Sequence, residues 1–170
     1  MGNFLDGEYR TKADMSWVID EKYTQKLKVV TKVLEAYANI IFKNNSDCKY
    51  PLGVFLNPFY NELSMGIQVS SDHETVKEDI SVAFKQIKNI AEGNIDLSIL
   101  AKAKNSIQQL YKDADNDSHD VAIAKSYACS AALHNAPLGE FERFPSTCQS
   151  VSREDLKDLA SQLLKENIIR

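Results

Sequence analysis

The sequence of 170 residues has few of the residues from which enzymes build short catalytic motifs. It has three histidines, His73, His119 and His134, and none has a second histidine four residues away. Helical spacing therefore cannot bring two imidazoles to one zinc ion. The six glycines are scattered, which excludes the common glycine-rich loops that bind nucleotide phosphates. We expect neither zinc chemistry nor nucleotide chemistry from this chain by itself.

Cysteine is equally scarce. The chain has Cys48, Cys129 and Cys148, an odd number with no C-x-x-C spacing, so a disulfide framework is not expected. The favoured interpretation is two buried thiols and one thiol in a loop. A single bridge between Cys129 and Cys148 is the alternative.

The chain also has no long apolar run and no excess of positive charge. Lysine and arginine are dispersed and the formal net charge is −4, which argues against nucleic acid and anionic membranes as partners. The apolar fraction of 44% and charged fraction of 26% are typical of a soluble globular protein, cytoplasmic or periplasmic. We expect residues 12–170 to form one domain after an N-terminal extension of residues 1–11.

Alternating apolar and polar residues predict three strands, over residues 12–20, 50–56 and 62–70. The third is the clearest, because its apolar residues occupy every second position. Those residues are Leu63, Met65, Ile67 and Val69. Residues 57–61 contain Asn57 and Pro58 and are predicted to form the turn between the last two strands.

Helical spacing with capping signals predicts the remaining elements. Thr24 can cap a helix over residues 24–42, and Ser71 with Glu74 forms a capping box for a helix over residues 73–92. Gly93 is predicted to end that helix, and Asp96 can cap the next. The next helix carries Leu100, Ala103, Ile107 and Leu110 on its apolar face.

Towards the carboxyl end, Val121 to Ala131 predict a fourth helix, and Pro137, Gly139 and Pro145 are predicted to break the chain. Ser152 is expected to cap the final helix through Asp155. The set of elements predicts an α+β, two-layer domain: a small, mostly antiparallel sheet with helices packed on one face. The helices 24–42 and 73–92 are expected on the same face.

Several of these segments resemble the pitrilysin/insulinase family of zinc metallopeptidases. Residues 50–104 give a hairpin opened by Tyr50, a helix ending in glycine, and a helix that contains LAKAK at residues 100–104. A later family signature, V-[ST]-x-E-D-[VL], is matched by VSREDL at residues 151–156. The resemblance covers about residues 12–167, with the segments in the expected order.

The resemblance implies a non-catalytic domain, because the family's H-x-x-E-H motif is missing. Such peptidases arrange homologous domains as two halves around a chamber, and only one domain binds zinc. Zinc is therefore expected in a partner domain and no cofactor in this chain, which would be inactive within a zinc metalloendopeptidase. Family domains usually close with one more strand, which would begin near Ile168, so we expect a fragment of a larger protein or a domain without its final strand.

The resemblance also implies two substrate-binding residues. In the half that faces the zinc, an arginine and a tyrosine seven residues later commonly bind the substrate backbone. Tyr50 matches the tyrosine, and Lys43 stands at the arginine position. Lysine keeps the charge but lacks the planar fork of arginine. The alternatives are a packing role for Tyr50 and a solvated helix end for Lys43.

The leading hypothesis is a non-catalytic domain that walls the chamber and helps to bind an extended peptide at an exposed sheet edge. Its predicted partners are the peptide substrate and a zinc-bearing domain of the same protein or of a partner subunit. The alternative is a zinc-free scaffold subunit of the same family. An unrelated α+β binding module is a third interpretation. The carboxylates of Glu74, Glu78 and Asp79 are interpreted as an exposed helix face and not as an acid–base pair.

Overall fold

The computed structural model describes residues 10–19, 24–45, 51–59, 62–72, 74–116 and 140–165. Its elements in chain order are β1 (Arg10–Ile19), α1 (Gln25–Asn45), β2 (Gly53–Phe59), β3 (Glu62–Asp72), α2 (Val76–Ala91), α3 (Leu97–Asn116), α5 (Glu140–Ser150) and α6 (Arg153–Lys165). The predicted helix between Val121 and Ala131 lies outside the described residues, and the single-domain assignment stays a prediction.

The three strands form one antiparallel sheet in the order β1-β3-β2. β1 pairs with β3 along its whole length, from Arg10 opposite Asp72 to Ile19 opposite Leu63. All three predicted strands therefore lie in one sheet, as the alternation in the sequence indicated. The long pairing with β1 also explains why β3 continues two residues beyond its predicted end at residue 70.

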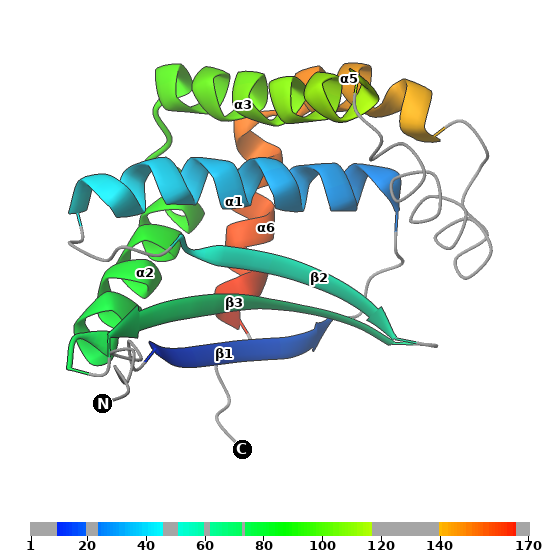
Figure 1. The fold of residues 1–170 in the computed structure, drawn as a ribbon. Coiled ribbons are helices and arrows are strands. Elements are labelled where there is room, and N and C mark those ends of the chain that lie inside the picture. The colour runs from blue at the N-terminus through cyan, green and yellow to red at the C-terminus, as the bar shows by residue number, and fades with distance from the viewer. Residues whose placement is uncertain are drawn as a thin grey trace, which may run out of the picture.

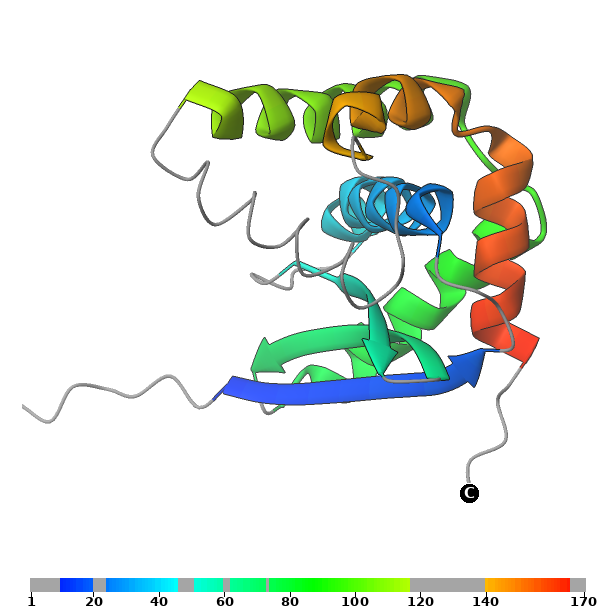
Figure 2. The same ribbon diagram turned by 90° about the vertical axis from the view of Figure 1, so that its right-hand side faces the viewer.

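The described helices all lie on one face of the sheet (Figures 1 and 2). α1 and α2 pack against that face, and α3 and α5 lie on the far side of α1 (Figure 2). α6 runs from the α5 level down towards the sheet, beside α2 (Figure 1). This arrangement confirms the predicted α+β class with helices on one face, and it adds that the helical layer is itself two helices deep.

The core is centred on α1, which is buried towards both the sheet and the upper helices. Its fully buried side chains include Val33, Leu34, Tyr37 and Phe42, and Ile67 of β3 is equally buried beneath them. Each such aliphatic or aromatic side chain contributes about 1.5–3 kcal/mol when it leaves water. Because α1 is buried between the sheet and the upper helices, its packing fixes the positions of its two ends and of β2, the strand that follows it.

The predicted stop at Gly93 is confirmed. Gly93 has φ +84°, a left-handed conformation that a residue without Cβ adopts readily. Its N–H donates to the Ile90 carbonyl at 2.9 Å, and the N–H of Asn94 donates to the Asn89 carbonyl at 3.0 Å. These are the two hydrogen bonds of a Schellman motif, which satisfy carbonyls at the end of α2.

Two predicted amino-terminal caps are also confirmed. The Thr24 Oγ1 accepts a hydrogen bond from the N–H of Leu27 at 3.1 Å. The Asp96 Oδ1 accepts one from the N–H of Ser98 at 2.7 Å. Both satisfy backbone donors that the first turn of a helix leaves unpaired.

The predicted capping box of Ser71 and Glu74 is wrong. α2 begins at Val76 with Thr75 at the N-cap position, and Ser71 belongs to β3. The Ser71 hydroxyl instead hydrogen-bonds Thr75 Oγ1 at 2.7 Å and donates to the carboxylate of Asp79. The pairing of β1 with the end of β3 explains the difference, because it keeps Ser71 in the sheet.

The predicted turn over residues 57–61 begins too early, because Asn57 and Pro58 lie within β2. The direction of the neighbouring N–H groups explains why proline is tolerated there. The N–H of Leu52 and Val54 point away from β3, to side chains of α1. Successive residues of a strand direct their backbone groups to alternate sides, so the nitrogen of Pro58, like those of Leu52 and Val54, faces away from β3. The N–H that proline lacks would therefore not have bonded β3.

Two predictions for α3 and α5 are wrong as well. Leu110 was expected inside but is 64% exposed, because it lies beyond the stretch of α3 that packs through Leu100 and Ala103. Pro145 was expected to break the chain but lies inside α5. Its carbonyl accepts a hydrogen bond from Gln108 Nε2 of α3 at 3.1 Å, which helps to hold this part of α5 in place.

Cys148 is a free, fully buried thiol, so the alternative bridge to Cys129 is wrong. Burial raises the pKa of the Cys148 thiol above its ordinary value, and the charge of Lys104 opposes the shift. Its Sγ lies 3.8 Å from the Lys104 carbonyl. Cys48 and Cys129 lie outside the described residues.

We predict that Tyr37→Phe destabilises the fold. The Tyr37 hydroxyl oxygen accepts the N–H of Asp96 at 2.9 Å, which ties α1 to the start of α3. Without that acceptor a partly buried N–H loses its partner, at a cost of about 1–3 kcal/mol. Urea unfolding at neutral pH measures the change. Leu97→Ala, at a side chain that is 65% exposed, is the control and should change stability little. Equal stabilities of Tyr37→Phe and the native chain would contradict the role of this bond.

Candidate substrate-binding surface

Lys43, one of the two predicted substrate-binding residues, lies in the last turn of α1 and is exposed. A lysine suits this place because the carbonyls at a helix carboxyl end carry partial negative charge. Asn45 adds a local cap, since its Nδ2 donates to the Ile41 carbonyl at 2.8 Å. The ammonium group of Lys43 is therefore at the surface, where it is accessible to a ligand.

Asn39, one turn before Lys43, fixes the point at which the chain returns from α1 to the sheet. Its Oδ1 accepts the N–H of Leu52 at 2.7 Å, and its Nδ2 donates to the Leu52 carbonyl at 2.6 Å. The side-chain amide thus pairs with the backbone of Leu52 in the way that a neighbouring strand would. Sequence reasoning missed this residue. An asparagine in a helix interior, where it is a poor helix former, was the available signal.

Glu35 makes a second link between α1 and the same strand. Its Oε1 accepts the N–H of Val54 at 3.4 Å, while its Oε2 lies 3.0 Å from the Lys32 ammonium. Glu35 and Asn39 are four residues apart and therefore share one face of α1. Together they bind outward-facing backbone groups at two alternate positions of the chain entering β2.

Tyr50, the other predicted substrate-binding residue, lies outside the described residues, as do the three histidines. The structure therefore does not show whether Tyr50 approaches Lys43, and their shared role stays a prediction. In the described ranges, no three His, Cys, Asp or Glu side chains gather closely enough to hold a metal ion. None of the helices in those ranges combines the length and apolar character needed to cross a membrane.

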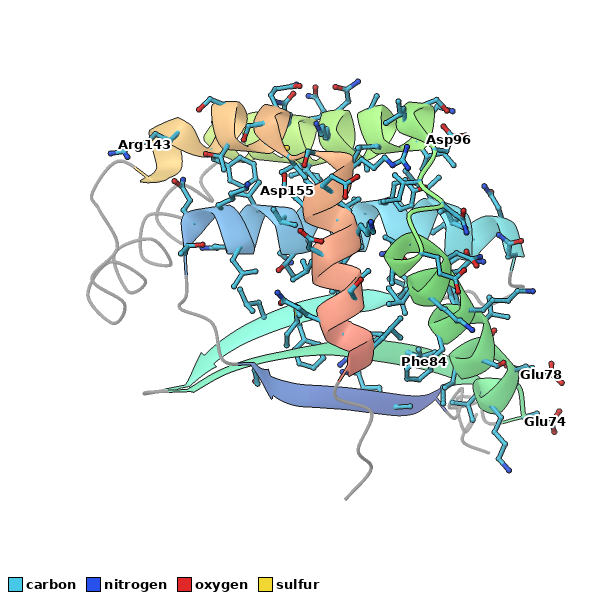
Figure 3. The ribbon with its side chains drawn as sticks, turned by 180° about the vertical axis from the view of Figure 1, so that it is seen from behind. Glu74, Glu78, Phe84, Asp96, Arg143 and Asp155 are labelled. Atoms are coloured by element: carbon cyan, nitrogen blue, oxygen red, sulfur yellow. The ribbon has the colours of Figure 1, made fainter. Side chains whose placement is uncertain are left out.

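Glu74 and Glu78 point away from the body of the protein at the start of α2, and both are exposed (Figure 3). This agrees with their interpretation as a solvated helix face. Asp79 departs from that interpretation, because it is only 6% exposed and hydrogen-bonds Ser71. Its carboxylate joins α2 to the end of β3.

The VSREDL segment forms the start of α6. Val151 is buried, and Ser152 and Asp155 form the predicted capping box. The Asp155 Oδ2 accepts the N–H of Ser152 at 2.7 Å, and the Ser152 Oγ accepts the N–H of Asp155 at 3.1 Å. Lys26 of α1 lies 2.6 Å from Asp155, whose place at the top of α6 is seen in Figure 3. This segment therefore joins α6 to the beginning of α1.

The charge state of Asp155 follows from these contacts. Burial by itself would raise the pKa of Asp155, but the hydrogen bonds from Lys26 and Ser152 outweigh it and lower that pKa below its ordinary value. The ionised carboxylate is thus the form that the folded protein favours.

The LAKAK segment likewise has a packing role. Leu100 and Ala103 are buried in the core, on the face of α3 that meets α1. Lys104 donates from its ammonium group to the Gln149 carbonyl at 2.9 Å and so joins α3 to α5. Both family-like segments therefore consist of residues that position helices.

Three solved structures illustrate the proteins that share this fold. A peptidase M16 inactive domain from Pseudomonas fluorescens matches with a TM-score of 0.65 and 13% identity, over 90% of this chain and 38% of that chain. A predicted insulinase family protease from Yersinia pestis gives a TM-score of 0.64 and 9% identity, over 92% of this chain and 37% of that chain. A mutant ferredoxin protease FusC, in complex with Arabidopsis ferredoxin, gives 0.63 and 14%, over 91% and 17% respectively.

The matches define the class of fold: an α+β domain of the kind found in M16 and insulinase-family peptidases, including a domain described as inactive. They confirm the resemblance that the sequence segments indicated. At these identities the likeness shows the fold alone. The chain spans less than two-fifths of each of the three structures. No family model and no curated protein matches the sequence.

We predict that Asp155 stabilises the fold in a pH-dependent way. Because its pKa is lowered in the folded state, its contribution is complete above the ordinary carboxyl pKa of 3.8 and is lost as pH falls through the lowered value. Asp155→Asn should therefore reduce the free energy of unfolding by about 1 kcal/mol at neutral pH. The difference from the native chain should shrink at about pH 3.

Asp158→Asn is the matched control, since Asp158 is exposed one turn further along α6. Urea unfolding across the acid range measures both variants. A difference between Asp155→Asn and the native chain that stays constant from neutral to acid pH would contradict the role of this carboxylate.

Proposed function

We propose that this chain is a non-catalytic domain of a zinc-dependent peptidase. In this proposal it forms part of the wall of the peptidase chamber and helps to bind an extended peptide substrate. The zinc and the general base belong to a partner domain of the same protein or to a partner subunit. The activity of the whole assembly would be attack of a zinc-activated water on a peptide carbonyl.

The observation that carries the proposal is the match of 90% of the chain to a peptidase M16 inactive domain. Two sequence segments add independent support, because LAKAK and VSREDL form the helix contacts and helix start on which this fold depends. The FusC structure, solved in complex with ferredoxin, supports a polypeptide as the class of substrate.

The face of the sheet on which no described helix lies supports the role as a wall. Residues of β3 alternate, and Met65, Ile67 and Val69 are buried on the helical side. Ser64, Gln68 and Ser70 therefore lie on the other face, where Ser64 and Gln68 are half-buried and Ser70 is buried. A face with polar residues of this kind suits a water-filled chamber better than contact with a second hydrophobic core.

Tyr50 and Lys43 are the proposed substrate contacts. Lys43 can offer an exposed ammonium group to a peptide carbonyl, and Tyr50 can offer a hydroxyl. Asn39 supports this placement, because it fixes Leu52 to α1 one turn before Lys43. Leu52 follows Tyr50 by two residues in the sequence.

We predict that Tyr50→Phe lowers peptide turnover in the longer protein that the proposal requires. Loss of a hydrogen bond made mainly in the transition state should cost about 1–3 kcal/mol, roughly tenfold to a hundredfold in rate. The denaturant midpoint of the 170-residue chain should stay unchanged. Lys43→Met tests the second contact in the same assays. Unaltered turnover in both variants would contradict the assignment of these residues and favour the alternatives, a packing role for Tyr50 and a solvated helix end for Lys43.

A second prediction concerns zinc. The isolated chain should retain no stoichiometric zinc after chelation and buffer exchange, and should cleave no peptide, because it lacks a three-ligand set with a base. Metal analysis of the chain and of the longer protein measures this. One zinc retained per isolated chain would contradict the proposal. A longer protein without zinc or activity would instead favour the scaffold alternative.

A further inference from the structure

A groove between the start of α1 and the first half of α6 has no part in the function proposed above. It lies on the helical side of the sheet, where α6 crosses α1 (Figure 3). Residues of these two helices and the residue that caps α1 line it. The groove is therefore separate from the face of the sheet that is proposed to line a chamber.

The groove has an apolar floor and a charged rim. Val30 and Leu159 of its lining are buried, and Leu27 is half-buried. Lys26 and Asp158 are exposed at the rim. The volume is about 250 Å³, which is below the roughly 300–1,000 Å³ of pockets that hold drug-sized ligands. A groove of this size and composition suits one long side chain with an apolar stem and a charged end.

The charge of the groove that a ligand can neutralise is negative. Lys26 and Asp155 compensate each other across the groove, with Nζ and Oδ1 2.6 Å apart. Asp158 lies one turn after Asp155 on α6, and it has no ion pair or hydrogen bond with another described residue. Its exposed carboxylate therefore attracts a cation to the rim.

The two helix starts beside the groove do not reverse this preference. The amino end of a helix attracts anions through N–H groups that have no partner in the helix. At α1, the Thr24 Oγ1 already accepts the N–H of Leu27 at 3.1 Å. At α6, Ser152 and Asp155 each accept the N–H of the other. Because side chains cap both helix starts, the carboxylate of Asp158 determines the preference of the groove.

We propose that the α1–α6 groove is a docking surface for an arginine side chain of a partner polypeptide. The aliphatic stem packs on Leu27 and Leu159, and the planar guanidinium donates two parallel hydrogen bonds to the Asp158 carboxylate. Arginine fits better than lysine because its fork matches a carboxylate and is more weakly hydrated. Arginine is also among the residues that anchor protein–protein interfaces in pockets. The inference goes beyond the proposed function and does not depend on it.

Titration of the 170-residue chain, followed by NMR, tests this docking. The probe is arginine with acetyl and methylamide ends, which represents one residue of a polypeptide. The amide signals of Leu27, Asp158 and Gln162 should shift, with a dissociation constant of about 1 mM. The matched probe has citrulline in place of arginine, which keeps the shape and removes the charge. It should bind at least about tenfold more weakly.

Variants of the chain locate the contact. Asp158→Asn keeps the size of an exposed side chain, so the fold is not disturbed, and binding of the arginine probe should weaken at least about tenfold. Glu154→Gln is the matched control, because Glu154 is exposed on the same helix, pairs with Lys157 at 3.6 Å and lies outside the groove. It should bind as the native chain does.

Lys26→Met gives a test of sign. It removes the cation beside the groove and releases the Asp155 carboxylate, so the arginine probe should bind about threefold more tightly. Weaker binding would mean that the ion pair itself forms the site, and would overturn the proposal. Equal binding of the arginine and citrulline probes, unchanged binding in Asp158→Asn, or no shifts at about 10 mM probe would also overturn it.

Butylguanidinium distinguishes a polypeptide partner from a small cation. It has the stem and head of arginine but no peptide groups. The Thr24 hydroxyl, exposed at the rim, can donate to a peptide carbonyl, so the blocked arginine should bind more tightly than butylguanidinium. Equal affinities would make the groove a site for small cations and overturn the polypeptide assignment. All these outcomes leave the proposed function to its own tests, since they involve neither Tyr50 nor the sheet.

Discussion

Helix α1 lies between the sheet and the upper helices, and its burial on two sides determines the placement of the other elements. Val33, Leu34 and Phe42 leave water completely, so the helix has little freedom to shift or rotate without opening the core. Polar contacts then extend outward from it: Tyr37 holds the start of α3, and Lys26 holds the start of α6. The sheet is attached through the same helix, because Asn39 and Glu35 bond the backbone at Leu52 and Val54.

This attachment makes the two edges of the sheet unequal. An open strand edge invites association with any other strand, and proteins commonly cover or interrupt it. Here side chains from a buried helix bond one edge, which is a fixed and specific cover.

The sequence predicted the regular parts of the fold because local signals agreed with tertiary packing. The alternation around Ile67 and the stop at Gly93 each had one physical cause, and the structure has both. The predictions from sequence were wrong where a residue or strand far away in the sequence determined the local structure. Ser71 lies in the sheet because β1 pairs with that end of β3. Pro58 is tolerated in β2 because its backbone nitrogen faces away from β3. Neither partner can be deduced from a local window.

The candidate site was less predictable for a similar reason. The segments that carry the family resemblance, around Leu100 and Ser152, cap and pack helices, so they identify a fold more securely than an activity. Lys43 lies exposed at the predicted helix end, and its pairing with Tyr50 stays a prediction. Asn39 was not predicted at all, because its importance lies in a bond across thirteen residues of sequence.

The central proposal is that the sheet of this domain faces a peptide held inside a peptidase chamber. A structure of the longer protein with an uncleaved peptide bound tests it most directly. The account predicts that the face of the sheet on which no described helix lies lines the chamber, with a zinc site on the opposing domain. A structure in which that face is turned outward, or in which the peptide contacts only the helices, would contradict the account.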